Sequence, residues 1–299
     1  MNKVLFTGAS GFLGENSLPI LTKDYSISTM GLTATDYYKV NLATQVPILE
    51  NSYDIVLHAA GKAHSVPKTE VEKKVFFDVN LQGTINLCAA LEKSGVPKAF
   101  IFISTVAVYG LDFGEEISED SPLSGTSPYA LSKIQAEHFL IDWCKRHNVV
   151  LGIIRPSLIA GPNPPGNLGA MIQGIKLGKY LSIAGGKARK SVLMVEDIAT
   201  LVPLLAKKGG IYNVCDTEQP TFRDLELLIS KQLDKSLPFT IPYRIAKLLA
   251  AVGDLIGNKS PINSNKLDKI TKSLTFSNKK ARLGLGWVPT NVLAHFRIK

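Results

Sequence analysis

The sequence predicts an α/β protein with a doubly wound parallel sheet and a smaller, mixed, mainly helical C-terminal lobe. Short apolar runs alternate with helical patterns through residues 1–160. A glycine-rich turn joins the first apolar run to the first helix, and small or hydroxyl residues follow the central runs. Such alternation indicates right-handed crossovers and a parallel sheet, whose ligands bind beyond the carboxyl ends of the strands.

The composition is that of a soluble enzyme. Of the 299 residues, 45% are hydrophobic and 20% charged, and no apolar run reaches the roughly 18 residues of a membrane span. The first apolar run begins at Val4, so we expect no signal peptide and a cytoplasmic protein. Cys88, Cys144 and Cys215 form no C-x-x-C pair, which indicates core residues in a reducing compartment and no metal site.

The net charge is +9, with many of the lysines in the C-terminal third. Nucleic-acid binding is one interpretation of such a balance. The basic residues are not interleaved with aromatic residues, however, and no recognition motif accompanies them. We therefore expect an anionic small substrate or a solvated basic surface, and no nucleic-acid partner.

The first turn has the context of a dinucleotide-binding turn. Val4–Phe6 is predicted to be a buried strand, the turn TGASGFLG covers 7–14, and an apolar helix face begins at Leu18. Glycines let the backbone approach a pyrophosphate, and the helix N-terminus offers free N–H groups and a positive dipole end. The cofactor-binding residues expected here are Gly8, Ser10, Gly11, Phe12, Leu13 and Gly14.

The second and third strands are predicted at 26–30 and 38–40. A dinucleotide fold usually carries an acidic residue at the end of the second strand, for the adenosine ribose. Gly31-Leu32-Thr33 stands there, without a carboxylate or an arginine, so the choice between NAD and NADP stays open.

The fourth strand, 54–58, is followed by the small residues Ala59, Ala60 and Gly61, which allow a cofactor to lie against its end. We interpret His58 as a buried strand histidine rather than a catalytic acid. The helix that follows is predicted to face inward with Phe77, Leu81, Ile85 and Leu87, and it carries Asn80 and Thr84.

The apolar run 99–103 is typical of a central parallel strand, and it ends in Ser104-Thr105. Tyr129 and Lys133 follow in the sequence YALSK, one turn apart on one helix face. A phenol with a pKa near 10 is a poor base, and a fixed ammonium would lower that pKa and hold a nicotinamide ribose. With the Thr105 hydroxyl, this set can move a proton at a sugar hydroxyl while hydride passes to or from a nicotinamide.

The alternation loosens near residue 160, which divides the chain into a dinucleotide-binding domain, 1–160, and a mostly substrate-binding remainder, 161–299. We expect 192–195 to return as a strand to the main sheet, followed by a helix, so that 190–207 rejoin the first domain. The apolar segment 245–256 suggests a membrane-surface helix or a packed lid or core helix. We prefer the packed helix, because the polar face is thin rather than strongly cationic.

The motifs together resemble the NAD-dependent epimerase/dehydratase branch of the extended short-chain dehydrogenases, which act on nucleotide sugars. The resemblance covers nearly the whole chain. It rests on TGASGFLG at 7–14, HAAG at 58–61, VNLQGT at 79–84, ISTVAVYG at 103–110, YALSK at 129–133, IIRPSLIAGP at 153–162 and GWVP at 286–289.

The resemblance implies a Rossmann fold that binds NAD or NADP, with Thr105, Tyr129 and Lys133 as the catalytic residues. Besides the glycine turn, Tyr129 and Lys133, it places the following residues at the cofactor: Asn41, Leu42, Ala59, Ala60, Gly61, Asn80, Ile103, Pro156 and Ile159. It places the following at the substrate, a nucleotide sugar expected to be UDP-linked: Ser104, Thr105, Val106, Asn167, Leu168, Arg189 and Lys190. Many relatives form homodimers through helices at 78–91 and 129–142, which we expect here by analogy.

Departures from the family pattern narrow the reaction. A 4,6-dehydratase would follow its threonine with Asp-Glu, where this chain has Val106-Ala107, and no cysteine lies near Thr105 for an epimerase-reductase. A 4-epimerase, of the UDP-glucose or UDP-N-acetylhexosamine type, and a 4-ketoreductase of a 4-keto-6-deoxy nucleotide sugar in surface-polysaccharide biosynthesis both fit, with the epimerase preferred. A non-catalytic dinucleotide sensor is the remaining alternative.

Overall fold

The computed structural model describes residues 1–63, 65–257, 260 and 262–298. Its centre is a seven-stranded sheet in the order β11-β7-β5-β4-β1-β2-β3, in which each pair of neighbours is parallel. The strands are β1 (Lys3–Thr7), β2 (Ser26–Gly31), β3 (Tyr38–Lys39), β4 (Ile55–His58), β5 (Ala99–Ile103), β7 (Val150–Pro156) and β11 (Gly210–Val214). The predicted doubly wound parallel sheet is confirmed.

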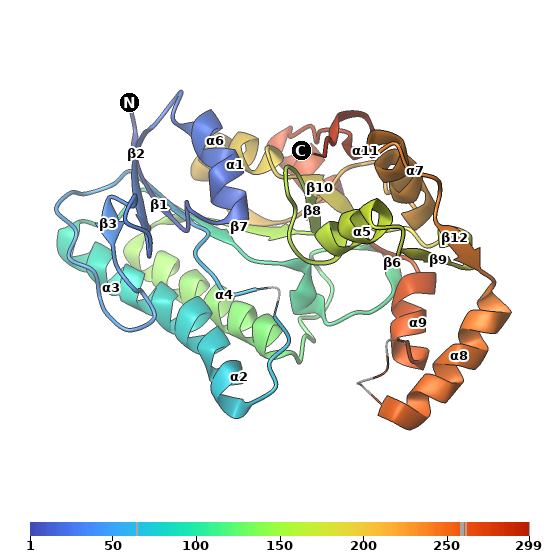
Figure 1. The fold of residues 1–299 in the computed structure, drawn as a ribbon. Helices are drawn as coiled ribbons and strands as arrows, with labels where there is room; N and C mark the ends of the chain where they lie inside the picture. Colours follow the sequence, from blue (N-terminus) through green and yellow to red (C-terminus); the bar gives the residue numbers. More distant parts are fainter. Residues whose placement is uncertain (64, 258–259, 261, 299) are drawn as a thin grey trace.

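Helices cover both faces of this sheet (Figure 1). On one face lie α2 (Glu70–Phe77), α3 (Gly83–Ser94) and α4 (Pro128–His147). Apolar residues of α3 and α4 share a core with β1, β4 and β5. On the other face lie α1 (Phe12–Leu21), α6 (Asp197–Lys208) and α10 (Lys279–Leu285). Strand residues therefore alternate between two cores: Leu5 faces α3 and α4, whereas Val4 and Phe6 face α1 and α6.

The helix after β4 faces inward with only one of the four residues that the sequence predicts. A π-helical segment, Asp78–Gln82, joins α2 to α3 and shifts the helical phase by one residue. Leu87 is buried as predicted, whereas Phe77, Leu81 and Ile85 are only half-buried, and Phe76, Asn80 and Thr84 are buried in their place. The prediction was wrong for these three residues because apolar spacing assumes an unbroken α-helix.

The second lobe combines short strands with helices. Its main core lies between the β8–β10 pair, Leu158–Ala160 with Val192–Met194, and α5 (Gly166–Lys176), α7 (Phe222–Gln232) and α11 (Val292–His295). Two further parallel pairs join distant segments: β9 (Leu181–Ile183) with β12 (Phe239–Ile241), and β6 (Gly114–Ile117) with β13 (Leu274–Phe276). The predicted mixed, mainly helical lobe is confirmed.

The strand predicted at 192–195 does not return to the main sheet. It is β10, and it pairs only with β8, whereas β11 takes the outer place beside β7. Apolar residues show that a strand is buried but do not reveal its partner. The sequence does not predict β11 because it starts with Gly210 and contains the polar Asn213, which is buried and hydrogen-bonded to Tyr109 and Ile117.

The C-terminus crosses back over the boundary predicted at residue 160. Ala281 and Leu285 of α10, together with Trp287, pack in the same core as α1 and α6. The indole of Trp287 donates a hydrogen bond to Thr200 on α6. Residues far along the chain thus complete the core on this face of the main sheet.

The helix pair α8 (Tyr243–Ile256) and α9 (Ser264–Thr271) extends from the lobe at the lower right of Figure 1. The prediction of a packed lid or core helix at 245–256 was wrong in its main point: only small side chains such as Ala246 and Ala250 are buried, and the large apolar ones are exposed. Within the described residues, no helix combines the length and apolarity needed to span a bilayer.

Candidate active site

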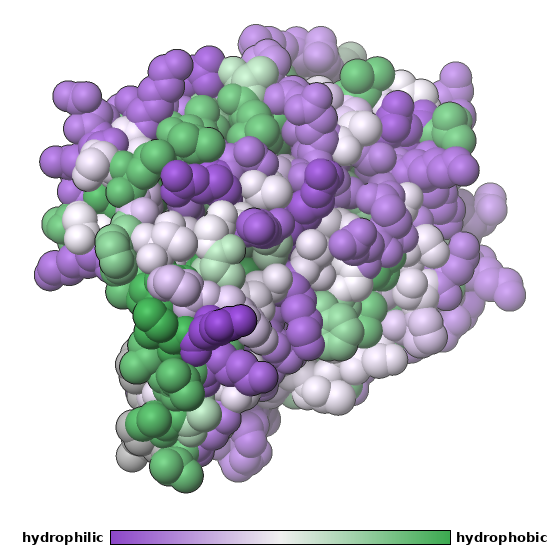
Figure 2. Space-filling view, turned by 90° about the vertical axis from the view of Figure 1, so that its right-hand side faces the viewer, coloured by the Kyte–Doolittle hydropathy of each residue, from purple (hydrophilic) through white to green (hydrophobic). Residues whose placement is uncertain are grey.

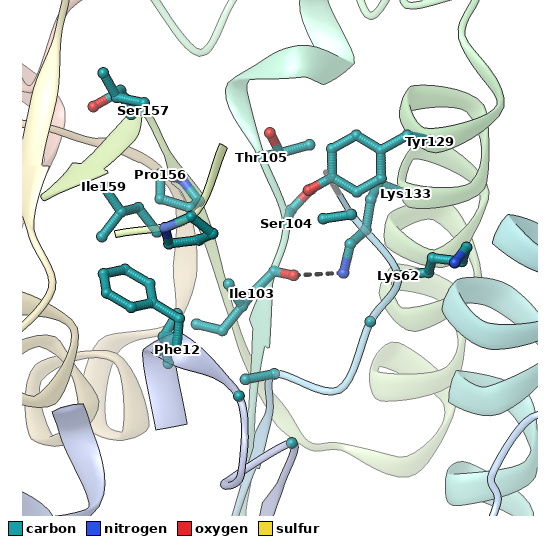
Figure 3. Close-up of a pocket in the computed structure, with 18 residues that line it drawn as sticks. Phe12, Lys62, Ile103, Ser104, Thr105, Tyr129, Lys133, Pro156, Ser157 and Ile159 are labelled. Atoms are coloured by element: carbon teal, nitrogen blue, oxygen red, sulfur yellow. Dashed lines mark hydrogen bonds between the residues drawn. The ribbon is translucent and has the colours of Figure 1, made fainter. Parts of the chain in front are cut away.

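The first cavity, of about 280 Å³, opens at the carboxyl ends of β1, β4, β5 and β7 (Figure 3). In parallel sheets this edge is where ligands bind. Most of the residues predicted for cofactor and catalysis line it: Gly8, Gly11, Phe12, Leu13, Ala59, Gly61, Ile103, Thr105, Tyr129, Lys133, Pro156 and Ile159. Ser104, predicted for the substrate, lines it too. Figure 3 shows Tyr129 and Lys133 of α4 on one side of the cavity, and Phe12, Pro156 and Ile159 on the other.

The glycine turn fits a dinucleotide because its residues leave no room for side chains. Gly8 has φ of +76°, and a Cβ there would lie 2.6 Å from the backbone nitrogen of Ala60. A Cβ on Gly14 would collide with Ala9, so this glycine allows α1 to pack tightly on the turn. Gly11 is the N-cap of α1 and no side chain caps the helix, which leaves N–H groups for a phosphate.

The phenol of Tyr129 lies at the boundary between α4 and the end of β5. Burial raises its pKa, and a side-chain hydrogen bond with Thr105 acts in the opposite direction. The sequence predicts that Lys133 lowers the pKa of Tyr129. In the structure this pKa is raised, so the prediction was wrong. At neutral pH the phenol therefore carries its proton and is suited to donate it to a keto oxygen.

The ammonium of Lys133 is directed at the sheet rather than at the phenol. Its Nζ donates a hydrogen bond of 2.8 Å to the carbonyl oxygen of Ile103, drawn in Figure 3. Burial lowers its pKa to about 8, although the charge of Glu137 acts to raise it. Gly61 allows this approach, since a Cβ there would lie 3.2 Å from the Lys133 Nζ.

Behind Lys133 lies a buried polar network that sequence reasoning missed. Glu137 accepts hydrogen bonds from Arg155 at 2.6 and 3.1 Å, and also from Ser104. Arg155 donates to the hydroxyl of Tyr109 at 2.9 Å, and this hydroxyl donates to Asn213 at 2.7 Å. Ser104, predicted to bind substrate, thus lines the cavity while its hydroxyl is used by Glu137. The four-residue spacing of Tyr129, Lys133 and Glu137 could have revealed this network.

Asn80 and His58 support the cavity from the α3 side. Asn80 accepts a hydrogen bond from the backbone nitrogen of Lys62 at 2.8 Å and donates to Ser132 at 2.9 Å. His58 lies between Thr7 at 2.6 Å and Thr84 at 3.0 Å, fully buried, which confirms the interpretation of a buried strand histidine. Both side chains position loops and strands around the cavity.

The burial of His58 makes the fold sensitive to acid. Burial, and next the charge of Lys133, lower the pKa of His58 from 6.5 to about 3. Between these values only the unfolded chain takes up the proton, so stability present above pH 6.5 is lost as the pH falls toward 3. For each unit by which the pH falls in this window, we expect His58 to lower the free energy of unfolding by ~1.4 kcal/mol.

Urea unfolding between pH 7 and 4 tests this expectation. The slope of unfolding free energy against pH should become shallower in His58→Gln and stay unchanged in His295→Gln, which removes an exposed histidine. Equal slopes in both variants would refute the assignment to His58.

A second cavity, of about 460 Å³, adjoins the first, and Leu158 lines both. Four residues predicted for the substrate line it: Val106, Asn167, Leu168 and Lys190. The Lys190 Nζ donates to the carbonyl oxygens of Lys269 and Lys272 at 3.0 and 3.1 Å, at the C-terminal end of α9. Burial lowers the pKa of Lys190 to about 8, with the charge of Asp112 acting to raise it.

Some predicted residues lie elsewhere. Arg189 lines a separate hollow with Glu116 and Glu218, away from both cavities. Ser10 and Asn41 are exposed, and neither lines the first cavity; Leu42 is buried in the core beneath α3. The following cavity residues were missed by sequence reasoning: Lys62, Ala63, Ser157, Leu158 and Pro165. Lys62 and Ala63 directly follow HAAG at 58–61, Ser157 and Leu158 lie within IIRPSLIAGP at 153–162, and Pro165 lies three residues after it, so the motifs themselves could have revealed them.

A carboxylate lies at the end of β2, although the sequence shows none at Gly31-Leu32-Thr33. Asp36 accepts hydrogen bonds from the backbone nitrogen and the hydroxyl of Thr33 at 3.0 and 2.6 Å. Its carboxylate oxygen would lie 2.6 Å from a Cβ on Gly31. A short turn brings Asp36 back to the end of β2. Asp36 is five residues beyond the last residue of the strand, so the residues at the strand end do not reveal it.

The parallel sheet, the glycine turn and the Thr105, Tyr129 and Lys133 set define an NAD(P)-dependent enzyme. The model of the NAD dependent epimerase/dehydratase family matches residues 4–215, and the chain belongs to this family. Its cofactor is NAD or NADP.

Two curated relatives align over nearly the whole chain. N-acetyl-alpha-D-glucosaminyl-diphospho-ditrans,octacis-undecaprenol 4-epimerase of Escherichia coli O157:H7 is 30% identical over 93% of this chain and 88% of its own. UDP-glucose 4-epimerase of Vibrio cholerae is 26% identical over 97% and 92%. The structure of RMD from Pseudomonas aeruginosa complexed with NADPH has the same fold, with a TM-score of 0.73 and 22% identity over 98% of this chain and 95% of that chain.

Proposed function

We propose that the protein is a 4-epimerase of a sugar held through a diphosphate, working by transient oxidation at C4 with bound NAD. The observation that carries the proposal is that Thr105, Tyr129 and Lys133 line the first cavity, while Val106, the residue after Thr105, lines the second. Thr105 is followed by Val106 and Ala107, whose side chains cannot act as the acid and base that elimination of water requires. Both full-length relatives reported above are 4-epimerases, which supports this reaction.

The cofactor, when bound, supplies hydride transfer at its nicotinamide. The turn at Gly8 and Gly11 with the N-terminus of α1 would hold the pyrophosphate, and Lys133 would hold the nicotinamide ribose. Pro156 and Ile159 would exclude water from the nicotinamide face. The Asp36 carboxylate at the end of β2 favours NAD, because it would repel the 2′-phosphate of NADP.

The proton at the C4 oxygen is handled by Tyr129. In the step from ketone to alcohol, the buried phenol donates its proton, which suits its raised pKa. In the step from alcohol to ketone, the phenolate must accept the proton, so positive charge at Lys133 supports this step. Thr105 would hold the C4 oxygen beside the phenol.

The second cavity suits the diphosphate and its carrier. α5 begins at this cavity without a side-chain cap, and its N-terminus attracts negative charge. An ammonium has three donors, and Lys190 gives two of them to carbonyl oxygens, so one remains for a phosphate oxygen. The apolar side chains of Leu168 and Met171 line the same cavity.

The test is an epimerisation assay with released cofactor measured by mass spectrometry. We expect about one NAD per chain from denatured protein, and interconversion of the gluco and galacto forms of UDP-glucose, UDP-N-acetylglucosamine or the N-acetylglucosaminyl diphosphate of a polyprenol. A deuterium label at C4 should be retained in the product, since the hydride returns to the carbon it left.

Two results would contradict the proposal. Stoichiometric consumption of NADPH with a 4-keto-6-deoxy nucleotide sugar would indicate a reductase. Bound cofactor without turnover of any diphosphate sugar would indicate a dinucleotide sensor.

The dimer through 78–91 and 129–142 stays a prediction, and light scattering of the pure protein tests it.

A further inference from the structure

Helix α8 exposes its large apolar side chains and buries its small ones. Leu248, Val252 and Leu255 are 70%, 59% and 89% exposed, and they lie three and four residues apart on one face. Ile245 and Leu249 extend this face on the side toward α9. Figure 2 shows the resulting column of hydrophobic side chains at its lower left. An amphipathic helix of a globular core has the opposite arrangement.

The helix cannot turn to bury this face. Ala246 and Ala250 pack against Leu267 of α9, so the two helices approach closely. A Cβ on Gly253 would collide with the carbonyl oxygen of Ile262. The small residues therefore fix which side of α8 is turned outward.

The exposed face continues beyond the helix. Phe239 of β12 is 74% exposed, and it is paired in register with Leu181 of β9, which is also exposed. We call the combined surface the apolar strip; it consists of Leu181, Phe239, Ile245, Leu248, Leu249, Val252 and Leu255.

The charges beside the apolar strip are positive. Arg244 and Lys247 are exposed on α8, and neither makes an ion pair with another residue of the described ranges. The acidic residue of α8, Asp254, is turned to the start of α9, where it accepts hydrogen bonds from the Ser264 backbone and hydroxyl at 2.9 and 2.6 Å. The chain as a whole carries a net charge of +9.

We propose that α8 docks the protein on an anionic lipid bilayer, with the apolar strip in the headgroup region and Arg244 and Lys247 on lipid phosphates. In α8 an exposed face of leucine, isoleucine and valine lies beside Arg244 and Lys247, which is the arrangement of a helix that lies in the interface. A second copy of this chain is the alternative occupant of the apolar strip, and the oligomeric state measured in the test below distinguishes it. An anionic surface complements both the apolar strip and its charge.

Docking would place the substrate cavity close to the bilayer. α9 packs on α8 through Leu267, and it contributes Lys269 and Ile270 to the second cavity. One helix thus separates the lipid surface from the cavity. Binding to the bilayer depends on this surface alone and not on which sugar is turned over.

The test is flotation of the purified full-length protein with vesicles of phosphatidylcholine and phosphatidylglycerol at 3:1. We expect the wild type to float with these vesicles at low salt, and to float far less with pure phosphatidylcholine. Leu248→Glu/Leu255→Glu should lower the vesicle-bound fraction at least about tenfold. Arg244→Gln/Lys247→Gln should reduce binding to the anionic vesicles and flatten its salt dependence.

The matched control is Leu32→Glu/Leu283→Glu, which adds the same charges at two exposed leucines outside the apolar strip. It should float like the wild type. All variants change exposed side chains, so their thermal unfolding temperature should equal that of the wild type. This measurement checks that each variant is folded. A wild type that stays unbound, equal binding by both glutamate variants, or a dimer lost only in Leu248→Glu/Leu255→Glu would overturn the proposal.

Discussion

Tyr129→Phe will lower turnover of the diphosphate sugar by roughly 10²- to 10⁴-fold while cofactor binding is retained. The substitution removes only the hydroxyl that exchanges a proton with the C4 oxygen. The glycine turn, Lys133 and Pro156 are unchanged, so the dissociation constant for NAD should change little. The rate is measured by single-turnover kinetics, and NAD binding by fluorescence quenching or calorimetry.

Tyr37→Phe is the matched control, because it removes a phenol that is exposed and lies outside both cavities. It should keep the wild-type rate. A Tyr129→Phe enzyme within a factor of a few of the wild type would show that another group carries the proton. Loss of cofactor binding in Tyr129→Phe would instead assign the phenol a binding role.

Arg155→Met will destabilise the fold by ~3–5 kcal/mol, because it leaves the Glu137 carboxylate buried without its partner. The pair is only 4% and 1% exposed, and its shorter contact is 2.6 Å. Burial acts to lower the pKa of Arg155, but the hydrogen bonds and charge interactions with Glu137 and Tyr109 together raise it. The free energy of unfolding is measured by urea titration at neutral pH.

Lys98→Met serves as the control, because it breaks an ion pair of similar length, 2.9 Å, at the surface, where Lys98 is 83% exposed. Its effect should stay below ~1 kcal/mol. The double variant Glu137→Leu/Arg155→Met should recover much of the stability lost in Arg155→Met, since no buried charge remains. If Arg155→Met unfolded as late as Lys98→Met, the buried pair would have no part in stability.

Much of the site could be predicted from the sequence because its residues lie next to regular elements. Gly8 and Gly11 follow a buried strand, Thr105 follows another, and Tyr129 and Lys133 share one helix face. Parallel strands bring their carboxyl ends to one edge, so residues that follow strands must meet there. The structure places all five at the first cavity.

The remaining site residues depend on contacts that spacing does not encode. Asp36 returns to the end of β2 through a turn, and Lys190 is held by carbonyl oxygens of α9, far along the chain. Arg189, its neighbour, extends to another surface. The pKa of Tyr129 was predicted in the wrong direction, because the sequence shows the nearby cation but not the burial that outweighs it.

The sequence by itself determined the parallel sheet, the glycine turn, the Thr105, Tyr129 and Lys133 set and the family, because these depend on local patterns of apolar and small residues. Only the tertiary structure decided which strand completes the sheet, how Glu137 and Arg155 support Lys133, and which face of α8 is exposed. An apolar pattern requires burial somewhere but does not specify the partner. In α8, close packing of Ala246, Ala250 and Gly253 turned the apolar side chains to the outside.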